Sequence, residues 1–265
     1  MMSDYEIIKK QYRKRKFFLI LSQFLLLVFV LGIWELFAEL KIIDDFIFSR
    51  PTAIVELLIR YIKRNELFNH VWISVVETVL GLVIGSIGGI IVASLLWYSK
   101  TVTKILEPFL NVLHALPKTA LAPIMIIWAG AGMKGIIVVA ISILFVITVL
   151  STYNHFMNVD EEKIKMMKSF GATKTQIFTK LIFPSNLGNI ASVIKINIGM
   201  SWIGVIVGEF IVSREGIGFL IMYGGQVFRL DLVMMGVLVL AFCAYVMYYI
   251  VEKLEKWIIK KRGEM

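Results

Sequence analysis

Two charged side chains that lie inside apolar stretches have the clearest capacity for chemistry in this sequence. They are Lys118 and Glu209, each in or near the end of a long apolar run. A charge inside a membrane segment is costly and usually marks a pathway or an ion pair. Lys118 could therefore attract an anionic solute, or its long side chain could extend to the membrane surface. Glu209 could line the same route, or it could be a helix-end carboxylate paired with Arg214 or Arg229.

Residues for catalysis or metal binding do not occur in recognisable sets. His70, His114 and His155 are scattered, with no Cys or Asp at metal-ligand spacing. The sequence contains no Gly-x-x-x-x-Gly-Lys-Ser/Thr motif, which would bind the phosphates of ATP. It also contains no Ser/His/Asp or Cys/His set for covalent catalysis. We therefore expect no catalytic residues and no metal site, and energy for any transport must come from elsewhere.

The composition is that of a polytopic membrane protein. Of the 265 residues, 58% are hydrophobic, and the mean hydropathy is +0.82, which is too apolar for a soluble globular domain. The formal net charge is +9. The basic residues gather at the edges of apolar segments, where membrane orientation explains them better than a nucleic-acid partner does. The single cysteine, Cys243, excludes a disulfide within the chain.

Apolar runs long enough to cross a bilayer occur six times. They lie at about Phe17 to Phe37, Val71 to Trp97, Ile105 to Ala129, Gly135 to Phe156, Ile190 to Val212 and Leu232 to Val251. If the N-terminus is cytoplasmic, the inside segments hold 18 Lys and Arg residues and the outside segments hold 8. Basic residues are retained on the cytoplasmic side. The sequence therefore predicts an all-α integral membrane protein with six transmembrane helices and with both termini in the cytoplasm.

This pattern divides the chain into three parts. Residues 1–70 form an N-terminal tail, the first span and an amphipathic segment after Pro51, which we expect to lie on the outer surface. Residues 71–257 hold five spans, and residues 258–265 form a cytoplasmic tail. Small residues recur in the second span at the spacing that lets helices approach closely, so we expect a packing seam there.

A polar segment from Val159 to Pro184 interrupts the apolar runs. Asp160 suits the N-cap of a first short helix, and Gly171 suits the exit from it. Thr173, with Gln176 three residues later, forms a capping box that opens a second helix, which we expect Pro184 to end. Both helices are amphipathic and too short to span a bilayer. From these residues alone, the segment could be only a capped hairpin on the membrane surface.

The spacing within this hairpin resembles a known signature. Gly171 is followed by nine residues, Leu181, one residue, and then Phe183 and Pro184. This resembles the cytoplasmic signature of bacterial ABC importer permeases, which reads Glu-Ala-Ala, three residues, Gly, nine residues, Ile, one residue, Leu-Pro.

The sequence departs from that signature at its first three positions, where Lys165, Met166 and Met167 stand in place of Glu-Ala-Ala. The two methionines would fill more of a groove than alanines do, so the cognate ATPase should be adapted to them. The resemblance implies that the hairpin couples the permease to an ATPase through Lys165, Met166, Met167, Gly171, Leu181, Phe183 and Pro184.

The third apolar run and the end of the fifth carry further resemblances. Leu116 and Pro117, then Pro123 and a turn beginning at Trp128, resemble the branch of permeases that import nitrate, sulfonates and taurine, although Ala129 replaces the usual Phe. In the same branch an Ala-Glu pair precedes a Gly-Leu-Gly turn, and here Gly208 and Glu209 precede Gly216, Ile217 and Gly218. Candidate pathway residues are therefore Pro117, Lys118, Pro123, Glu209, Gly216 and Gly218.

These resemblances imply the type I fold of ABC importer permeases, in the bacterial plasma membrane. They imply a non-catalytic subunit that forms the pathway for a small solute such as nitrate, a sulfonate or taurine. The implied partners are two cytoplasmic ABC ATPases that carry ATP and Mg²⁺, a second permease subunit in a homodimer, an extracytoplasmic solute-binding protein, and membrane lipids.

Other functions stay open at this stage. The same machinery could import a vitamin or a precursor of the thiamine or riboflavin type. An ion-driven secondary carrier is a further alternative, but the acidic residues Glu77 and Glu107 lie near span ends and form no obvious relay. A membrane enzyme would need a catalytic set that the sequence lacks.

Overall fold

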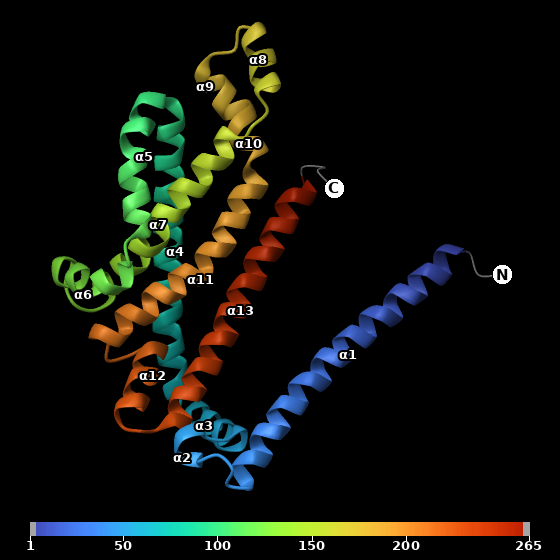
Figure 1. Cartoon of the computed structure of the whole chain (residues 1–265), viewed down its shortest axis with the longest axis vertical. Coiled ribbons are helices and arrows are strands. Elements are labelled where there is room, and N and C mark those ends of the chain that lie inside the picture. Colours follow the sequence, from blue (N-terminus) through green and yellow to red (C-terminus); the bar gives the residue numbers. More distant parts are fainter. Residues whose placement is uncertain (1–3, 262–265) are drawn as a thin grey trace.

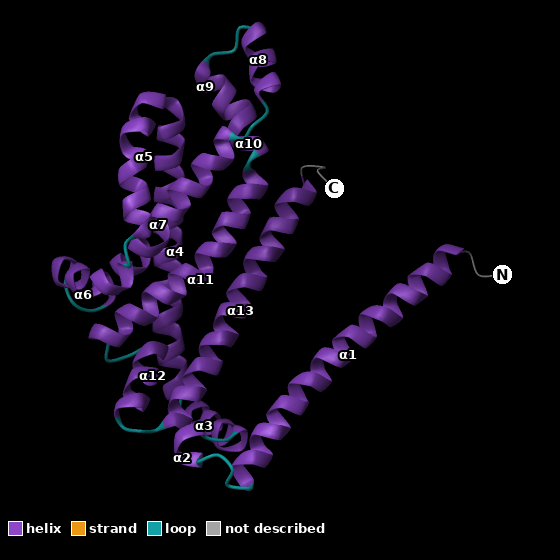
Figure 2. Ribbon diagram, in the orientation of Figure 1, coloured by secondary structure: helices purple, strands orange, loops and turns teal. Residues whose placement is uncertain are grey.

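The computed structural model describes residues 4–261 of the chain, and in this range every regular element is a helix (Figure 2). Residues 1–3, and the last four residues of the predicted tail 258–265, lie outside the described part. The elements are α1 (Asp4–Glu39), α2 (Asp45–Phe48), α3 (Pro51–Lys63), α4 (Glu66–Tyr98), α5 (Lys100–Ala115), α6 (Lys118–Ala129), α7 (Met133–Met157), α8 (Glu161–Ser169), α9 (Lys174–Ile177), the π-helical turn η1 (Phe178–Ile182), α10 (Phe183–Ser185), α11 (Leu187–Val212), α12 (Ile217–Gln226) and α13 (Leu230–Lys261).

Five of the six predicted spans are confirmed as continuous helices of spanning length. They are the apolar part of α1 (Phe17–Glu39), α4, α7, α11 and α13. The third predicted span is not one continuous helix, because α5 and α6 meet at an angle of 100°. The break falls at Leu116, whose backbone is extended with a ψ of 136°. A residue that precedes proline avoids the helical conformation, and Pro117 follows directly.

The core of the bundle is the contact between α4, α7 and α11. The glycines of α4 form the predicted packing seam: a Cβ atom on Gly81 would lie 2.8 Å from the Cβ of Ala140, and one on Gly89 would lie 2.7 Å from the Cβ of Thr148. On α11, Gly204 fits against the backbone of Ala140 in the same way. Close helix approach through small residues gives dispersion contact that lipid cannot supply.

Helix α1 lies apart from this bundle. It leaves the end formed by α2 and α3 and diverges from α13 along its length (Figure 1). Its apolar part is not buried against the rest of the described chain. Its junction is fixed by Glu35, whose carboxylate accepts hydrogen bonds from the hydroxyl and the backbone N–H of Thr52, at 2.7 and 3.0 Å.

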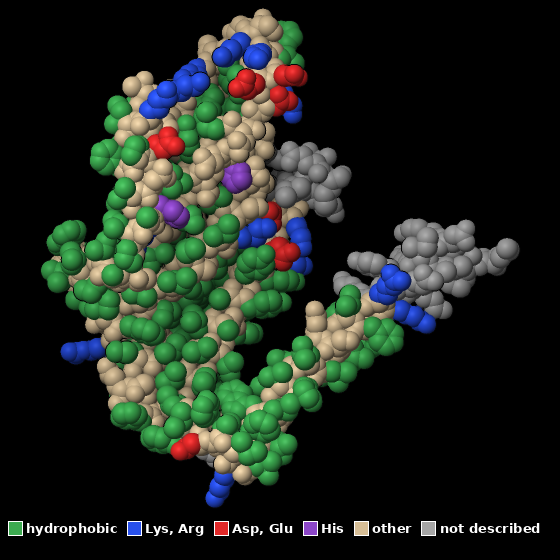
Figure 3. Space-filling view, in the orientation of Figure 1, with side chains coloured by type: hydrophobic (Ala, Val, Ile, Leu, Met, Phe, Trp, Pro, Cys, Tyr) green, Lys and Arg blue, Asp and Glu red, His purple; other side chains and the backbone are tan. Residues whose placement is uncertain are grey.

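The amphipathic segment after Pro51 forms α3 and packs on a neighbouring span. Ile54 and Leu57 are buried against Leu232 and Met235 at the start of α13. The opposite end of the molecule holds α8, α9 and the start of α5, and Lys and Arg side chains gather there (Figure 3). The fold therefore has a basic end with a hairpin and a second end built by α3 and α12, joined by an apolar middle.

Candidate functional site

The hairpin at the basic end begins as the sequence predicts. The Asp160 carboxylate accepts a hydrogen bond from the N–H of Glu162 at 2.9 Å and so caps α8. Gly171 follows α8 with a φ of +77°, a left-handed conformation in which glycine has no steric penalty. The capping box is also present, because the Thr173 hydroxyl accepts from the N–H of Gln176 and the Gln176 side chain accepts from the N–H of Thr173.

The second helix of the hairpin does not end at Pro184, contrary to the prediction. It passes through η1 into α10, which holds Pro184 in its first turn and ends at Ser185. Proline is tolerated in a first turn because it needs no N–H donor there. Asn186 then separates α10 from α11, and its side-chain amide donates to the carbonyl of Ile182 at 2.9 Å.

The predicted coupling residues divide between two faces of the hairpin. Met167, Leu181 and Phe183 turn inward and pack on a buried cluster that includes Phe156 and Phe178. The phenylalanine rings lie close together. The ring centroids of Phe156 and Phe178 are 5.5 Å apart, and those of Phe178 and Phe183 are 6.0 Å apart. These residues therefore fix the hairpin to the spans.

The outer face of the hairpin carries two more of the predicted residues. Lys165 lies 3.8 Å from Glu161 in an exposed ion pair, and Met166 is 55% exposed. Phe170, just before Gly171, is 83% exposed, and sequence reasoning missed it. The sequence does contain a signal for this position, because a large apolar residue that precedes a helix-ending glycine lies at the tip of a hairpin. The hairpin extends beyond the bundle (Figure 1), and its tip therefore presents an apolar contact surface there.

The break between α5 and α6 brings two pathway candidates together. Pro117 is the residue that precedes α6, and Lys118 is its first residue, with its ammonium donating to the carbonyl of His114 at 3.2 Å. Pro123 lies inside α6 and is exposed. Helix α6 turns sideways at about the middle of the bundle (Figure 1). Ala122 and Ile126 of α6 pack on α7, so the opposite face of α6 is left open.

The other three pathway candidates meet where α11 turns into α12. Glu209 is only 1% exposed, and its carboxylate accepts hydrogen bonds from the N–H of Gly218 and from the hydroxyl of Ser74 on α4. The Ser74 hydroxyl in turn accepts from the N–H of Ile217 at 2.7 Å. Gly216, with a φ of +106°, donates its N–H to Nδ1 of His70 at 3.0 Å. Three side chains from α4 and α11 thus cap the first turn of α12.

We call Ser74, Glu77, Glu209 and the first turn of α12 the α12 anchor. Glu77 of α4 is 1% exposed and lies beside Glu209. Its Oε2 atom has no hydrogen-bond partner within the described residues. Sequence reasoning did not connect Glu77 with Glu209, although Ser74 and Glu77 lie three residues apart on one face of α4.

The ion pair predicted between Glu209 and Arg229 is not formed. Arg229 instead pairs with Asp231 at 2.8 Å, and that hydrogen bond raises the pKa of the guanidinium. Arg214, the other candidate partner, is exposed. The hydrogen-bond donors to the Glu209 carboxylate are therefore neutral groups, the Ser74 hydroxyl and the Gly218 N–H, and not an arginine.

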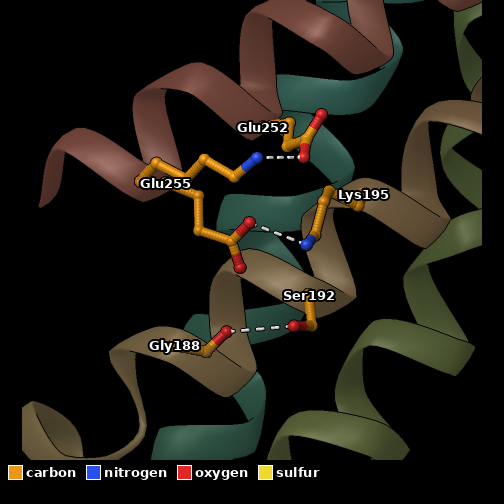
Figure 4. Close-up of polar contacts among 6 residues, drawn as sticks. Gly188, Ser192, Lys195, Glu252 and Glu255 are labelled. Atoms are coloured by element: carbon orange, nitrogen blue, oxygen red, sulfur yellow. Dashed lines mark hydrogen bonds and ion pairs between the residues drawn. The ribbon is translucent and has the colours of Figure 1, made fainter. Parts of the chain in front are cut away.

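Two further polar residues of α11, Lys195 and Asn197, connect it to the other spans. Figure 4 shows Lys195 of α11 pointing toward Glu255 of α13, and the charged atoms lie 2.7 Å apart. The Asn197 amide, fully buried, donates to the hydroxyls of Ser86 on α4 and Thr148 on α7, at 2.9 and 2.8 Å. These contacts fix α11 against three helices of the bundle.

Among residues 4–261, no three His, Cys, Asp or Glu side chains form a group that could hold a metal ion. The site features are thus a capped hairpin with an apolar tip, a broken span with a lysine at the break, and the α12 anchor. The protein family of the chain identifies the class of protein in which these features occur. Residues 85–262 match the family described as "Binding-protein-dependent transport system inner membrane component".

The chain belongs to this family. It is therefore a multi-pass inner-membrane permease subunit of an ABC importer, and the secondary-carrier and enzyme alternatives are excluded. The family description gives it a solute-binding protein as a partner. The permease is the membrane component of such a system, and ATP hydrolysis belongs to a separate ATPase chain.

Three relatives have names that state a solute. The putative aliphatic sulfonates transport permease SsuC of Bacillus subtilis is 28% identical over 88% of this chain and 85% of its own length. The taurine transport permease TauC of Escherichia coli is 25% identical over 90% of this chain and 89% of its own. The formylaminopyrimidine transport permease ThiX of Halalkalibacterium halodurans is 26% identical over 74% of this chain and 77% of its own.

Solved structures of ABC importers share the fold. An inward-facing structure of the MetNI methionine transporter matches with a TM-score of 0.63 and 16% identity, over 71% of this permease and 93% of that chain. A bacterial ABC transporter involved in alginate import matches with a TM-score of 0.65 and 14% identity, over 94% of this permease and 99% of that chain. The predicted ABC importer permease fold is confirmed.

Proposed function

We propose that two copies of this permease form the solute pathway, with the open faces of α5 and α6 toward the centre of the pair. The support is the apolar surface that a single copy leaves uncovered. Phe109 and Val112 on α5 and Trp128 on α6 are 64%, 61% and 83% exposed. Helix α1, which stands away from its own bundle, is free to pack on the second copy. In this arrangement residues 71–257 are the permease core, and residues 1–70 form an accessory part.

The hairpin from α8 to α10 contacts a cytoplasmic ATPase in this proposal. The observation that carries it is the exposed pair Met166 and Phe170 at the hairpin tip, because an apolar surface outside the membrane is normally covered by a partner. The excess of Lys and Arg in the inside segments, 18 against 8 outside, supports a cytoplasmic location for this end. Two ATPases with ATP and Mg²⁺ then drive the pair, and the binding protein docks at the opposite end.

Copurification tests the hairpin contact. Phe170→Glu places a charge on the tip, and we expect it to abolish recovery of the ATPase with the permease. Phe228→Glu is the matched control, because Phe228 is 69% exposed in the turn between α12 and α13, at the other end of the molecule. Equal recovery of the ATPase with both variants would reject the hairpin as its docking site.

The proposed solute is a small sulfonate such as taurine. SsuC and TauC are relatives over most of the chain, and Lys118 supplies a positive charge at the break between α5 and α6. A pyrimidine precursor of thiamine is the second candidate, supported by ThiX. Uptake of radiolabelled taurine and of formylaminopyrimidine by cells that express the permease, its ATPase and its binding protein distinguishes the two. Saturable pyrimidine uptake without taurine uptake would reject the sulfonate.

A further inference from the structure

A cavity of about 500 Å³ lies between the hairpin and the ends of α4 and α7, in the size range of ligand-binding pockets. Its lining includes Trp97, Tyr153 and Phe156. Trp97 is next to the last residue of α4, and Tyr153 lies in the last two turns of α7. Trp and Tyr at span ends typically mark the level of the lipid headgroups.

The charged residues that line this cavity are mostly basic. Its lining holds four lysines, of which Lys165, Lys168 and Lys174 come from the hairpin and Lys100 from the start of α5. Glu161 is the one acidic residue in the lining, and its carboxylate lies 3.8 Å from the ammonium of Lys165. The lining therefore keeps a net positive charge. The site is therefore suited to an anion that touches the hairpin and the spans at once.

Lys174 shows how the cationic groups relate to the aromatic wall. Its ammonium donates to the carbonyl of Tyr98 at 2.7 Å and lies 5.7 Å from the centre of the Trp97 ring. The ammonium groups of Lys100 and Lys168, by contrast, have no hydrogen bond or ion pair in the part of the chain that the structure describes. Two ammonium groups, one from α5 and one from α8, are thus available for a ligand.

We propose that this cavity binds the phosphate group of an anionic phospholipid such as phosphatidylglycerol, with Lys100 and Lys168 as its main contacts. Basic pockets between spans at a membrane surface are typical sites for anionic headgroups. The phosphate bridges the hairpin to the start of α5, so that the lipid stiffens the connection between them. The tip of the hairpin is a separate surface, because the exposed residues Met166 and Phe170 do not line the cavity, whereas Lys165, a predicted coupling residue, does.

The test uses the full chain in complex with its partner ATPase. Binding of phosphatidylglycerol to the detergent-solubilised complex is measured by native mass spectrometry over a lipid titration, with phosphatidylcholine as the neutral lipid. Lys100→Gln with Lys168→Gln is expected to weaken phosphatidylglycerol binding roughly 25-fold, at about fivefold for each lysine. Phosphatidylcholine binding is expected to stay unchanged.

The matched control removes two other lysines of the same hairpin. Lys163 and Lys180 do not line the cavity, so Lys163→Gln with Lys180→Gln is expected to leave the lipid affinity within about twofold. An equal loss in both double variants would show general attraction to a basic surface and overturn the site. Loss of the ATPase from the Lys100→Gln, Lys168→Gln complex at unchanged lipid affinity would assign the cavity to an acidic segment of the ATPase instead.

A free anion is the remaining competitor for the cavity. Inorganic phosphate is titrated calorimetrically into the complex in phosphatidylcholine nanodiscs. We expect no saturable heat at millimolar phosphate. A saturable heat that disappears in the Lys100→Gln, Lys168→Gln variant would make the site one for a soluble anion and overturn the lipid proposal.

Discussion

The α12 anchor gives the sharpest prediction, because its carboxylate serves two buried donors at once. Glu209→Ala removes the acceptor for the Ser74 hydroxyl and for the Gly218 N–H. Glu209 is only 1% exposed, so water cannot replace its carboxylate as the acceptor. A buried donor without an acceptor costs about 1–3 kcal/mol. Side-chain hydrogen bonds within membrane proteins average about 0.6 kcal/mol, which sets the lower limit. We expect Glu209→Ala to lower the free energy of unfolding by about 3 kcal/mol.

The assay is thermal unfolding of the purified permease in detergent. For a chain of this size, about 3 kcal/mol corresponds to a decrease of roughly 6–12 °C in Tm. Hydrogen exchange should also increase at Ile217 and Gly218, whose N–H groups bond to Ser74 and Glu209. Exchange in α8 should not change, because the hairpin is at the other end of the molecule (Figure 1).

Glu77→Gln is the control at the neighbouring buried carboxyl. It leaves the Glu209 acceptors of the Ser74 hydroxyl and the Gly218 N–H in place, so we expect the free energy of unfolding to fall by less than about 1 kcal/mol. A Glu209→Ala variant that keeps its Tm but has a raised KM for solute uptake would refute the reasoning. Glu209 would then be a residue of the pathway rather than a cap of α12.

Two further predictions concern packing and solute charge. Gly204→Ala places a Cβ against the backbone of Ala140 and should cost about 1–3 kcal/mol in thermal unfolding. Gly199→Ala, on the same helix with no atom within 4 Å of the added Cβ, should instead gain about 1 kcal/mol; equal effects would contradict the close contact of α7 and α11. Lys118→Met should raise the KM for uptake of an anionic solute about fivefold, as one unit charge at contact distance in water is worth about 1 kcal/mol. Unchanged uptake kinetics would remove Lys118 from the pathway.

The hairpin was predictable because its signals are local. A cap at Asp160, a capping box at Thr173 and a glycine at 171 each act over one helical turn, and each is present as expected. The wrong end of the second helix has the opposite cause. The π-helical turn before Pro184, and the amide that Asn186 donates to Ile182, depend on packing against the spans.

The break in the third predicted span shows that prolines alone do not predict where a helix breaks. Pro108 and Pro123 both lie inside helices, and only Pro117 falls at a break. Sequence alone indicates a bend but not its size. The 100° angle lets Ala122 and Ile126 of α6 pack on α7, and this gain depends on a partner helix that the local sequence does not specify.

The α12 anchor was hidden for a different reason. A carboxylate near the end of a span requires a partner, and Arg214 and Arg229 are the nearby candidates in the sequence. No local pattern indicates that the partner of Glu209 is a serine 135 positions away. The contact arises only because α4 and α11 pack side by side through small residues, including Gly81 against Ser201. Tertiary packing thus selected a neutral partner over a charged one, which avoids burying an ion pair.

Helix α11 connects the two ends of the molecule that carry these features. It follows α10 of the hairpin through Asn186 alone and carries Glu209 in its last turn. Its 26 residues span about 39 Å, at about 1.5 Å per residue. The amide of Asn197 and the ion pair of Lys195 with Glu255 fix it to its neighbours along the way. A displacement of the hairpin by an ATPase would therefore move α11 as one body and reach the cap of α12 directly. On this argument, closure at one face of the membrane and release at the other are coupled through a single helix.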